Sequence, residues 1–298
     1  MPAPAHLVRQ RSLSHNNAVY WAAFSPDDKK LATASLDNTV KLWSVADGRL
    51  LATLKGHTDG VAFVAFLTDG SLVTASLDRT LKVWPADGGQ AKLTLSGHQD
   101  YLTCAAVSSS GALLASGGFD KTVRLWDGVS GAALATLTGH EASVQAVAIS
   151  PKGSIVASGG DDRSIRLWHV EQRRLQQVLT GHKLAVEALT FSLKDDLLAS
   201  ASADGSVRFW SLDSKPLANI GYRAVGIRSL AFSPEGQLLA AGGTDGGIRL
   251  IGVRDRRPVS TTPAHKNTVY GVAFNATGKL LASAGFDRTI HLWKINSL

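Results

Sequence analysis

One motif recurs seven times along this 298-residue chain and limits its fold more than any other feature. An aspartate is followed six residues later by tryptophan or, once, isoleucine, as in Asp37-Asn-Thr-Val-Lys-Leu-Trp43 and Asp245-Gly-Gly-Ile-Arg-Leu-Ile251. Successive aspartates are 41 or 42 residues apart, at Asp37, Asp78, Asp120, Asp162, Asp204, Asp245 and Asp287. A fixed period of this length is typical of folds that repeat one supersecondary unit. Because the units fill the chain, we expect residues 1–298 to form a single repeat domain.

Each unit contains short apolar runs separated by turn residues. In the fourth unit the runs 144–149 and 155–158 are separated by Ser150-Pro-Lys-Gly153. Short runs rich in Val, Ile and Leu and bounded by Pro, Gly and Asp predict β-strands, and no helical period is sustained anywhere. Four such strands per unit predict an all-β fold, a seven-bladed β-propeller of four-stranded antiparallel blades.

The order of strands within a unit predicts how the ring closes. The seventh unit ends at Trp293-Lys-Ile-Asn-Ser-Leu298, with no fourth strand after it. A surplus strand, residues 7–13, lies at the other end of the chain and aligns with the outer strand at residues 50–54. We expect residues 7–13 to complete blade seven, because an open ring would leave two blades with exposed edges.

A histidine lies about 22 residues before most of the aspartates, often as Gly-His, as in Gly56-His57 and Gly139-His140. With a period of about 42 and a late tryptophan, the chain resembles the WD40-repeat family over nearly its whole length. One departure is that the terminal Trp-Asp pair is present only at Trp126-Asp127.

The resemblance implies a hydrogen-bonded tetrad inside each blade. Tryptophan donates to a Ser or Thr hydroxyl, the hydroxyl to histidine, and histidine to aspartate, which satisfies every buried polar group. An active site is built once, whereas this set recurs in six units, so we expect no catalytic residues. The matching positions are His15, Thr33, Asp37 and Trp43; His57, Thr74, Asp78 and Trp84; His98, Ser116, Asp120 and Trp126; His140, Ser158, Asp162 and Trp168; His182, Ser200, Asp204 and Trp210; His265, Ser283, Asp287 and Trp293.

The sixth unit keeps Asp245 but has Tyr222, Ala241 and Ile251 at the other three positions. Losing one member of a buried network strands its partners, whereas replacing several together can be nearly neutral. We therefore expect blade six to be held by apolar packing.

The chain carries 31 Lys and Arg against 24 Asp and Glu, a formal net charge of +7. Many of the basic residues recur one or four positions after the aspartates, which spreads them around the ring as solvated groups. This placement disfavours a nucleic-acid partner, which would need a concentrated basic surface with interleaved aromatics.

Cysteine usage and segment hydrophobicity limit the remaining options. Cys104 is the only cysteine, so no internal disulfide can form, and we expect it to be a small buried hydrophobe. Trp21, on the expected innermost strand, is a further candidate for the core.

Histidines of successive units lie in different blades, so we expect no metal site and no cofactor. Neither a signal peptide nor a membrane span is predicted. We expect an intracellular protein, cytoplasmic or nuclear.

The resemblance implies a non-catalytic scaffold that binds peptides of partner proteins, a monomeric propeller acting as a subunit of a complex. In that family the partner-contacting residues often lie three and five after the histidine and just before the aspartate, on the top face. Those positions hold Tyr20, Leu36, Leu77, Tyr101, Phe119, Tyr270 and Phe286. Blades four to six contribute Gln145, Asp161, Glu187 and Arg228, which divides the face into an apolar and a polar half. Two alternatives remain open: a platform for an enzymatic or regulatory activity at the central channel, and binding of acidic ligands such as RNA.

Overall fold

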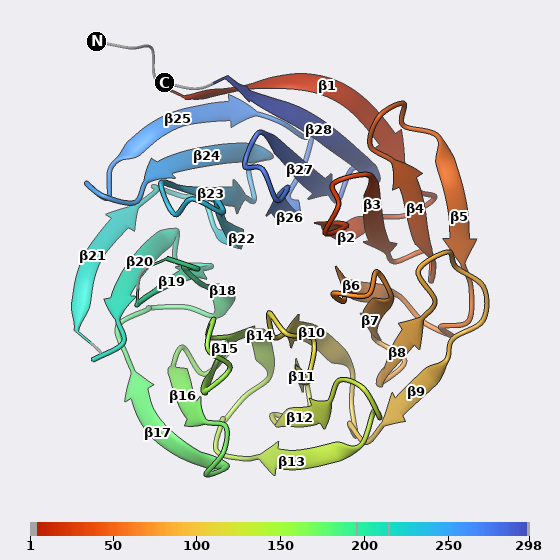
Figure 1. The fold of residues 1–298 in the computed structure, drawn as a ribbon. Helices are drawn as coiled ribbons and strands as arrows, with labels where there is room; N and C mark the ends of the chain where they lie inside the picture. The colour runs from red at the N-terminus through yellow and green to blue at the C-terminus, as the bar shows by residue number, and fades with distance from the viewer. Residues whose placement is uncertain (1–4, 195, 214, 297–298) are drawn as a thin grey trace.

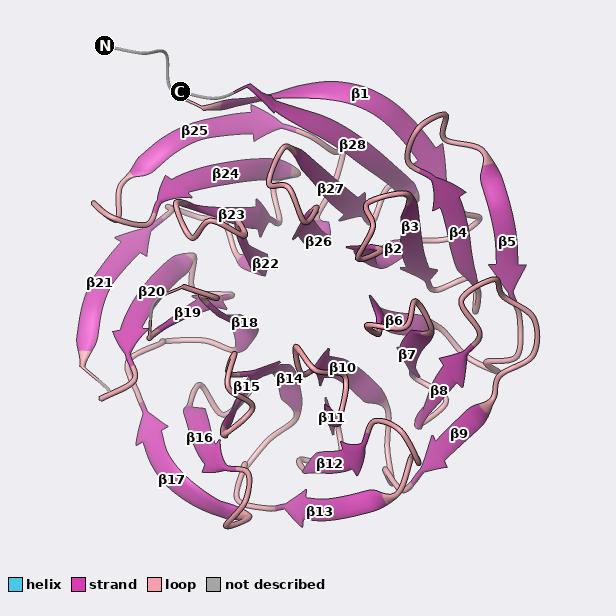
Figure 2. Ribbon diagram, in the orientation of Figure 1, coloured by secondary structure: helices cyan, strands magenta, loops and turns pink. Residues whose placement is uncertain are grey.

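The computed structural model describes residues 5–194, 196–213 and 215–296. These residues form a closed ring of seven four-stranded antiparallel sheets around a central channel (Figure 1). Only strands and loops are present in this described part, and it has no helix that could cross a membrane (Figure 2). The predicted all-β, seven-bladed propeller is confirmed.

The four strands of each blade run from the channel to the rim. Blade one contains β2 (Val19–Phe24), β3 (Lys30–Ser35), β4 (Val40–Ser44) and β5 (Leu50–Leu54). Blade two contains β6 (Val61–Phe66), β7 (Leu72–Ser76), β8 (Thr80–Trp84) and β9 (Leu93–Ser96). Blade three contains β10 (Leu102–Val107), β11 (Leu113–Gly118), β12 (Val123–Asp127) and β13 (Ala133–Leu137). Blade four contains β14 (Val144–Ile149), β15 (Ile155–Gly160), β16 (Ile165–His169) and β17 (Arg174–Leu179).

The remaining blades follow the same order. Blade five contains β18 (Val186–Phe191), β19 (Leu197–Ser202), β20 (Ser206–Ser211) and β21 (Pro216–Gly221). Blade six contains β22 (Ile227–Phe232), β23 (Leu238–Gly243), β24 (Gly247–Gly252) and β25 (Pro258–Pro263). Blade seven contains β26 (Val269–Phe274), β27 (Leu280–Gly285), β28 (Thr289–Asn296) and, at the rim, β1 (His6–Ser14).

Burial changes systematically from the channel to the rim. Every residue of the second strands β7 and β19 is buried, whereas the outer strand β17 is mostly exposed. The second strands lie between neighbouring blades and therefore need small residues. A Cβ placed on Gly159 would lie 2.6 Å from Val186 Cγ1 of the next blade, so a larger residue there would push the two blades apart.

Apolar clusters join each pair of neighbouring blades among the described residues. Trp126 of blade three packs with Phe63 and Leu95 of blade two, and Trp168 of blade four packs with Leu125 of blade three. The other tetrad tryptophans occupy equivalent clusters, and Ile251 takes this place in blade six. Contacts between blades therefore hold the ring together, and large aromatic side chains supply much of the buried area.

The ring closes as predicted, because the N-terminal strand β1 pairs antiparallel with β28 of blade seven. Leu13 of β1 is buried in the cluster that joins blades seven and one. The Arg11 guanidinium donates hydrogen bonds to the backbone oxygens of Ala46 and Asp47 in blade one. A second turn of blade one, between β2 and β3, contributes Asp28, which accepts a hydrogen bond from Asn275 Nδ2 of blade seven at 2.8 Å. Closure thus combines strand pairing, apolar packing and polar contacts.

Candidate functional site

Hydrogen-bonded tetrads support the loops of one face of the ring. In blade four, Trp168 Nε1 donates to Ser158 Oγ at 2.7 Å, and His140 Nε2 lies 2.7 Å from the same oxygen. His140 Nδ1 lies 2.7 Å from Asp162 Oδ2. Because a carboxylate only accepts, Nδ1 carries the proton and Nε2 accepts from the hydroxyl. The same four side-chain types meet in blades one, two, three, five and seven.

A fifth residue joins each tetrad, and the sequence analysis did not include it. Asp162 Oδ1 accepts from the backbone N–H and the hydroxyl of Ser164, at 3.0 and 2.8 Å. The equivalent hydroxyl residues, two positions after each tetrad aspartate, are Thr39, Thr80, Thr122, Ser164, Ser206 and Thr289. In blade five His182 Nδ1 is closer to Ser206 Oγ, at 2.9 Å, than to Asp204, at 3.4 Å. In the sequence, the recurrence of Ser or Thr two positions after each tetrad aspartate could have identified this fifth residue.

Each tetrad aspartate also connects two loops. Asp162 Oδ2 accepts from the backbone N–H of Glu141, in the loop that follows the outer strand of blade three. The aspartate itself lies in the turn between the second and third strands. The histidine loop and the aspartate turn are therefore held together on one face of the ring, called here the top face.

Burial and hydrogen bonding set the charge states within the tetrads. Burial lowers the pKa of His15, His98 and His182, that of His182 to about 4. Burial alone would raise the pKa of Asp204, but hydrogen bonds from Ser206 and the Lys183 backbone outweigh it and hold that pKa at about 2. The tetrads of blades one, three and five therefore contain a neutral imidazole and an ionised carboxylate at neutral pH.

Blade six has the expected apolar packing, with Ala241, Ile251 and Tyr222 in one cluster, but its aspartate also has a charged partner that the sequence analysis did not predict. The Arg249 guanidinium donates to both carboxylate oxygens of Asp245, at 3.1 and 2.5 Å. Its Cζ lies over the Tyr222 ring, 4.9 Å from the centroid. Arg249 is only 4% exposed, so this residue is also not one of the solvated basic groups expected from the repeat.

The physical reason is the loss of the histidine that binds the aspartate in the other blades. In blades three to five the arginine at this position lies against the glycine that precedes the tetrad histidine. In blade six Ala241 and Ile251 offer no polar group, and Tyr222 offers an aromatic face. The arginine therefore turns inward, where ion pairing and the aromatic ring stabilise its charge.

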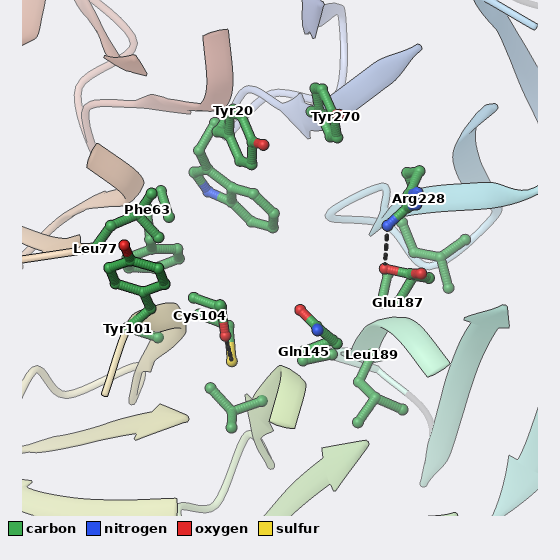
Figure 3. Close-up of a pocket in the computed structure, with 18 of the residues that line it drawn as sticks. Tyr20, Phe63, Leu77, Tyr101, Cys104, Gln145, Glu187, Leu189, Arg228 and Tyr270 are labelled. Carbon is green, nitrogen blue, oxygen red and sulfur yellow. Dashed lines mark hydrogen bonds and ion pairs between the residues drawn. The ribbon is translucent and has the colours of Figure 1, made fainter. Parts of the chain in front are cut away.

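The top face surrounds a cavity of about 460 Å³ at the central channel. Every blade contributes one residue of its innermost strand to this cavity. In blades one to five and in blade seven, that residue is five positions after the tetrad histidine, and in blade six it is Arg228. These channel-lining residues are Tyr20, Ala62, Thr103, Gln145, Glu187, Arg228 and Tyr270. Side chains from all sides point into the opening (Figure 3).

Aromatic side chains line one half of this cavity. Tyr20 and Tyr270 stack with ring centroids 4.3 Å apart, and burial raises the pKa of Tyr20 to about 12. Tyr101 and Phe119 meet edge to face at 5.8 Å and are 43% and 40% exposed. Neutral tyrosine hydroxyls beside exposed aromatic edges offer apolar area with a few hydrogen-bonding groups.

Polar side chains line the other half and pair with one another. Arg228 Nη1 lies 2.5 Å from Glu187 Oε2, and Gln145 Nε2 donates to Asp161 at 3.1 Å. Figure 3 shows the Arg228–Glu187 pair facing the aromatic half across the opening. One wall of the cavity is therefore aromatic, whereas the other combines these polar groups with aliphatic residues such as Leu189 and Leu230.

Five of the seven top-face residues named from the sequence line the cavity: Tyr20, Leu77, Tyr101, Phe119 and Tyr270. Leu36 and Phe286 are not among its lining residues, although Phe286 packs beside Tyr270 with ring centroids 6.1 Å apart and is 48% exposed.

Sequence reasoning missed two large aromatic residues of the cavity. Trp21, considered for the core, is half-buried and lines the cavity with Phe63, their ring centroids 5.4 Å apart. Both follow the channel-lining position by one residue. A register irregularity at this point of β2 and β6 lets consecutive residues reach the channel, which strict strand alternation would not predict.

Cys104 also lines the cavity instead of lying wholly inside a blade. Burial raises the pKa of its thiol to about 12. The sulfur is therefore protonated at neutral pH and is a poor nucleophile.

Two family models together match nearly the whole chain. The model described as WD domain, G-beta repeat, matches residues 8–44, 48–85 and 89–127. The model described as IFT122 first beta-propeller matches residues 126–296, which is more than half of the chain.

Two curated proteins resemble this chain over short segments. Denticleless protein homolog B of Xenopus laevis is 45% identical over 60 residues, which is 20% of this chain and 8% of that protein. Human WD repeat-containing protein 86 is 45% identical over 49 residues, 16% of this chain and 13% of that protein. The matched segments span little more than one repeat and a small fraction of either relative.

Proposed function

The chain belongs to the WD40-repeat β-propeller family, and we propose that it is a non-catalytic scaffold whose top face binds a segment of a partner protein. The observation that carries this proposal is the aromatic wall of the channel cavity. Tyr101, Phe119 and Phe286 are each at least 40% exposed although they are large and apolar. Exposed apolar groups beside a cavity are typical of a binding site.

The aromatic wall favours an apolar or aromatic anchor residue on the partner. Such a residue entering the opening would contact the stacked Tyr20 and Tyr270 on one side and Tyr101 and Phe119 on the other. Buried aromatic contacts of this kind supply much of the affinity in protein interfaces. The polar pairs opposite would orient the backbone of the bound segment.

The charges of the top-face loops favour an acidic segment around that anchor. Eight exposed basic residues lie in these loops: Lys55, Arg79, Lys121, Arg163, Lys183, Arg223, Lys266 and Arg288. Only four exposed acidic residues lie there: Asp100, Glu141, Asp161 and Asp245. A basic rim attracts a partner of opposite charge and speeds its association.

The repeated Ser-His-Asp sets argue against catalysis at the top face. Each serine or threonine oxygen already accepts from a buried tryptophan and contacts histidine. These six hydroxyl residues are fully buried, so a substrate could not reach the oxygen, and the same arrangement recurs around the ring. We therefore propose that these sets support the loops only.

Selection of binders from a random-peptide library on the full chain would test the proposal. Enriched peptides should contain an aromatic or large apolar residue next to acidic residues, and their affinity should fall as salt rises. Tyr270→Ala and Phe119→Ala should each weaken binding by roughly 1–3 kcal/mol, about 5- to 150-fold, with little change in stability.

Val129→Ala and Leu193→Ala are matched controls. These apolar residues are 81% and 61% exposed and lie in turns at the opposite ends of the strands. Both variants should bind the selected peptides with wild-type affinity. The proposal fails if the control variants lose as much affinity as the top-face variants, or if the top-face variants lose none.

A further inference from the structure

Blade seven departs from the other blades at one position of the repeat. Four residues after the tetrad aspartate the other six blades have a basic residue: Lys41, Lys82, Arg124, Arg166, Arg208 and Arg249. Blade seven has His291 instead, and Ala264 precedes its tetrad histidine where blades two to five have glycine. The Arg166 guanidinium occupies the space beside Gly139, and a histidine is too short to fill the equivalent space.

A cavity of about 350 Å³ occupies that space. Its wall includes His265, Asp287 and His291, together with Arg9 and Lys266. Arg9 and Lys266 are both exposed, so their side chains can turn toward solvent and away from the cavity. His291 itself is only 6% exposed.

Three metal-binding side chains converge on this cavity. One donor atom each from His265, Asp287 and His291 lies within 4.8 Å of the other two. His265 Nδ1 is 2.9 Å from Asp287 Oδ1, and the two imidazole rings stack with centroids 4.5 Å apart. Nδ1 of His291 is buried and has no hydrogen-bond partner. A buried polar atom without a partner is destabilising, which makes it a candidate ligand.

We propose that blade seven binds one divalent transition-metal ion, such as Zn²⁺, through His265 Nδ1, a carboxylate oxygen of Asp287 and an imidazole nitrogen of His291. Two imidazoles with one carboxylate form a donor set used by zinc and by other first-row metals. Metal–ligand bonds of about 2.1 Å place neighbouring donors roughly 3.0–3.4 Å apart. The His265–Asp287 separation of 2.9 Å is already close to this value, and the His291 donor must turn out of its stacked position and move closer to both.

Proton balance at His265 is simple. The metal replaces the proton that Nδ1 shares with Asp287, and the neutral imidazole carries its proton on Nε2 instead. Nε2 then donates to Ser283 Oγ, which lies 2.7 Å away, so the direction of this hydrogen bond reverses. No net proton is released from the histidine. The cavity leaves room for water at the remaining metal positions.

The position of the site gives it a consequence for the fold. His265 precedes the innermost strand β26, Asp287 lies in the turn before β28, and His291 lies on β28, opposite Ser12 of β1. A bound ion would cross-link these segments in the blade that closes the ring. We expect binding to stabilise the folded chain, because the unfolded chain has no preformed site.

Metal binding is measured on the full, tag-free chain by equilibrium dialysis against Zn²⁺ and elemental analysis. We expect one bound Zn²⁺ per chain. His291→Arg, which installs the residue type of blades three to five, should retain less than about a tenth of that metal. His169→Arg is the matched control: it makes the same change on β16 of blade four, outside the cavity, and should bind as the wild type does.

Thermal unfolding supplies a second, independent readout. Zn²⁺ should raise the melting temperature of the wild type and of His169→Arg by several degrees and leave that of His291→Arg unchanged. If circular dichroism shows that His291→Arg does not fold, His291→Gln takes its place in both measurements. The proposal is overturned if the wild type binds no more Zn²⁺ than the His291 variant, or if His169→Arg loses the metal equally.

Discussion

Blades four and six hold the same turn by different chemistry. Both have an aspartate in the turn between their second and third strands, and both have an arginine four residues later. In blade four, Asp162 bonds to His140 and Arg166 lies against Gly139. In blade six the arginine itself turns inward and binds the aspartate. The turn therefore requires a donor for its carboxylate, and either an imidazole or a guanidinium can supply it.

The two solutions differ in how they respond to acid, and this gives the largest expected effect. The pKa of His182 is about 4 in the folded chain against 6.5 when unperturbed, so the unfolded state binds the proton first as pH falls. Asp204 raises the pKa of His182 and Arg208 lowers it, but burial dominates. Stability is thus fully present above pH 6.5 and is lost as pH falls towards 4. The pKa of Asp204, about 2 against 3.8, extends the loss below that range.

Because His15, His98 and His182 all have lowered pKa values, we expect the free energy of unfolding to fall by several kcal/mol between about pH 7 and pH 4. Denaturant titrations at several pH values measure this. Amide exchange should accelerate more in β20 of blade five than in β24 of blade six, where arginine replaces histidine as donor. Equal acceleration of amide exchange in both strands would contradict the expectation that a blade with a histidine donor is more sensitive to acid than one with an arginine donor.

Removing the aspartate from each blade sharpens the comparison. Asp162→Ala strands His140 Nδ1, the Glu141 N–H and two donors of Ser164, and should cost about 1–3 kcal/mol of stability. Asp245→Ala should cost less, about 1 kcal/mol, because the Asp245 side chain is 42% exposed, so that its removal lets water reach the Arg249 guanidinium.

Chemical denaturation of both variants measures this difference. Asp162→Asn and Asp245→Asn are additional controls, because asparagine keeps the shape of the side chain and removes its charge. If Asp245→Ala lowers the free energy of unfolding as much as Asp162→Ala does, the aspartate of blade six contributes as much stability as that of blade four, and the expected difference between the two blades is wrong.

The smallest expected effect comes from one conservative substitution made in two blades. Arg249→Lys removes the bidentate contact with Asp245 and the stacking on Tyr222, and should cost about 1 kcal/mol. Arg166→Lys lies in a blade where the histidine binds the aspartate, and should change stability by less than about 0.5 kcal/mol. Thermal melts of the two variants would decide this, and equal shifts would mean that Arg249 behaves as an ordinary repeat position.

Several residues of the candidate site were predictable from the resemblance to the WD40-repeat family. The partner-contacting positions of that family, counted from each histidine and aspartate, include Tyr20, Tyr101, Phe119 and Tyr270, and these four residues line the cavity. The positions of Trp21 and Phe63 in the cavity were not predictable, because a local irregularity in the innermost strands turns consecutive residues toward the channel. Such an irregularity leaves no mark in the pattern of apolar residues.

The sequence by itself determined the number of blades, the strand order and the closing strand, whereas the tetrads came from the resemblance to the family. The first three follow from a period of 41 or 42 residues, because each unit must bury its faces against its neighbours in the same way. Only the tertiary structure decided where individual side chains depart from the repeat. Arg249 turns inward because Tyr222 replaces histidine, and His291 faces His265 because no arginine fills the space between them. Both depend on volumes left empty by other residues, and empty volume is a property of packing in three dimensions.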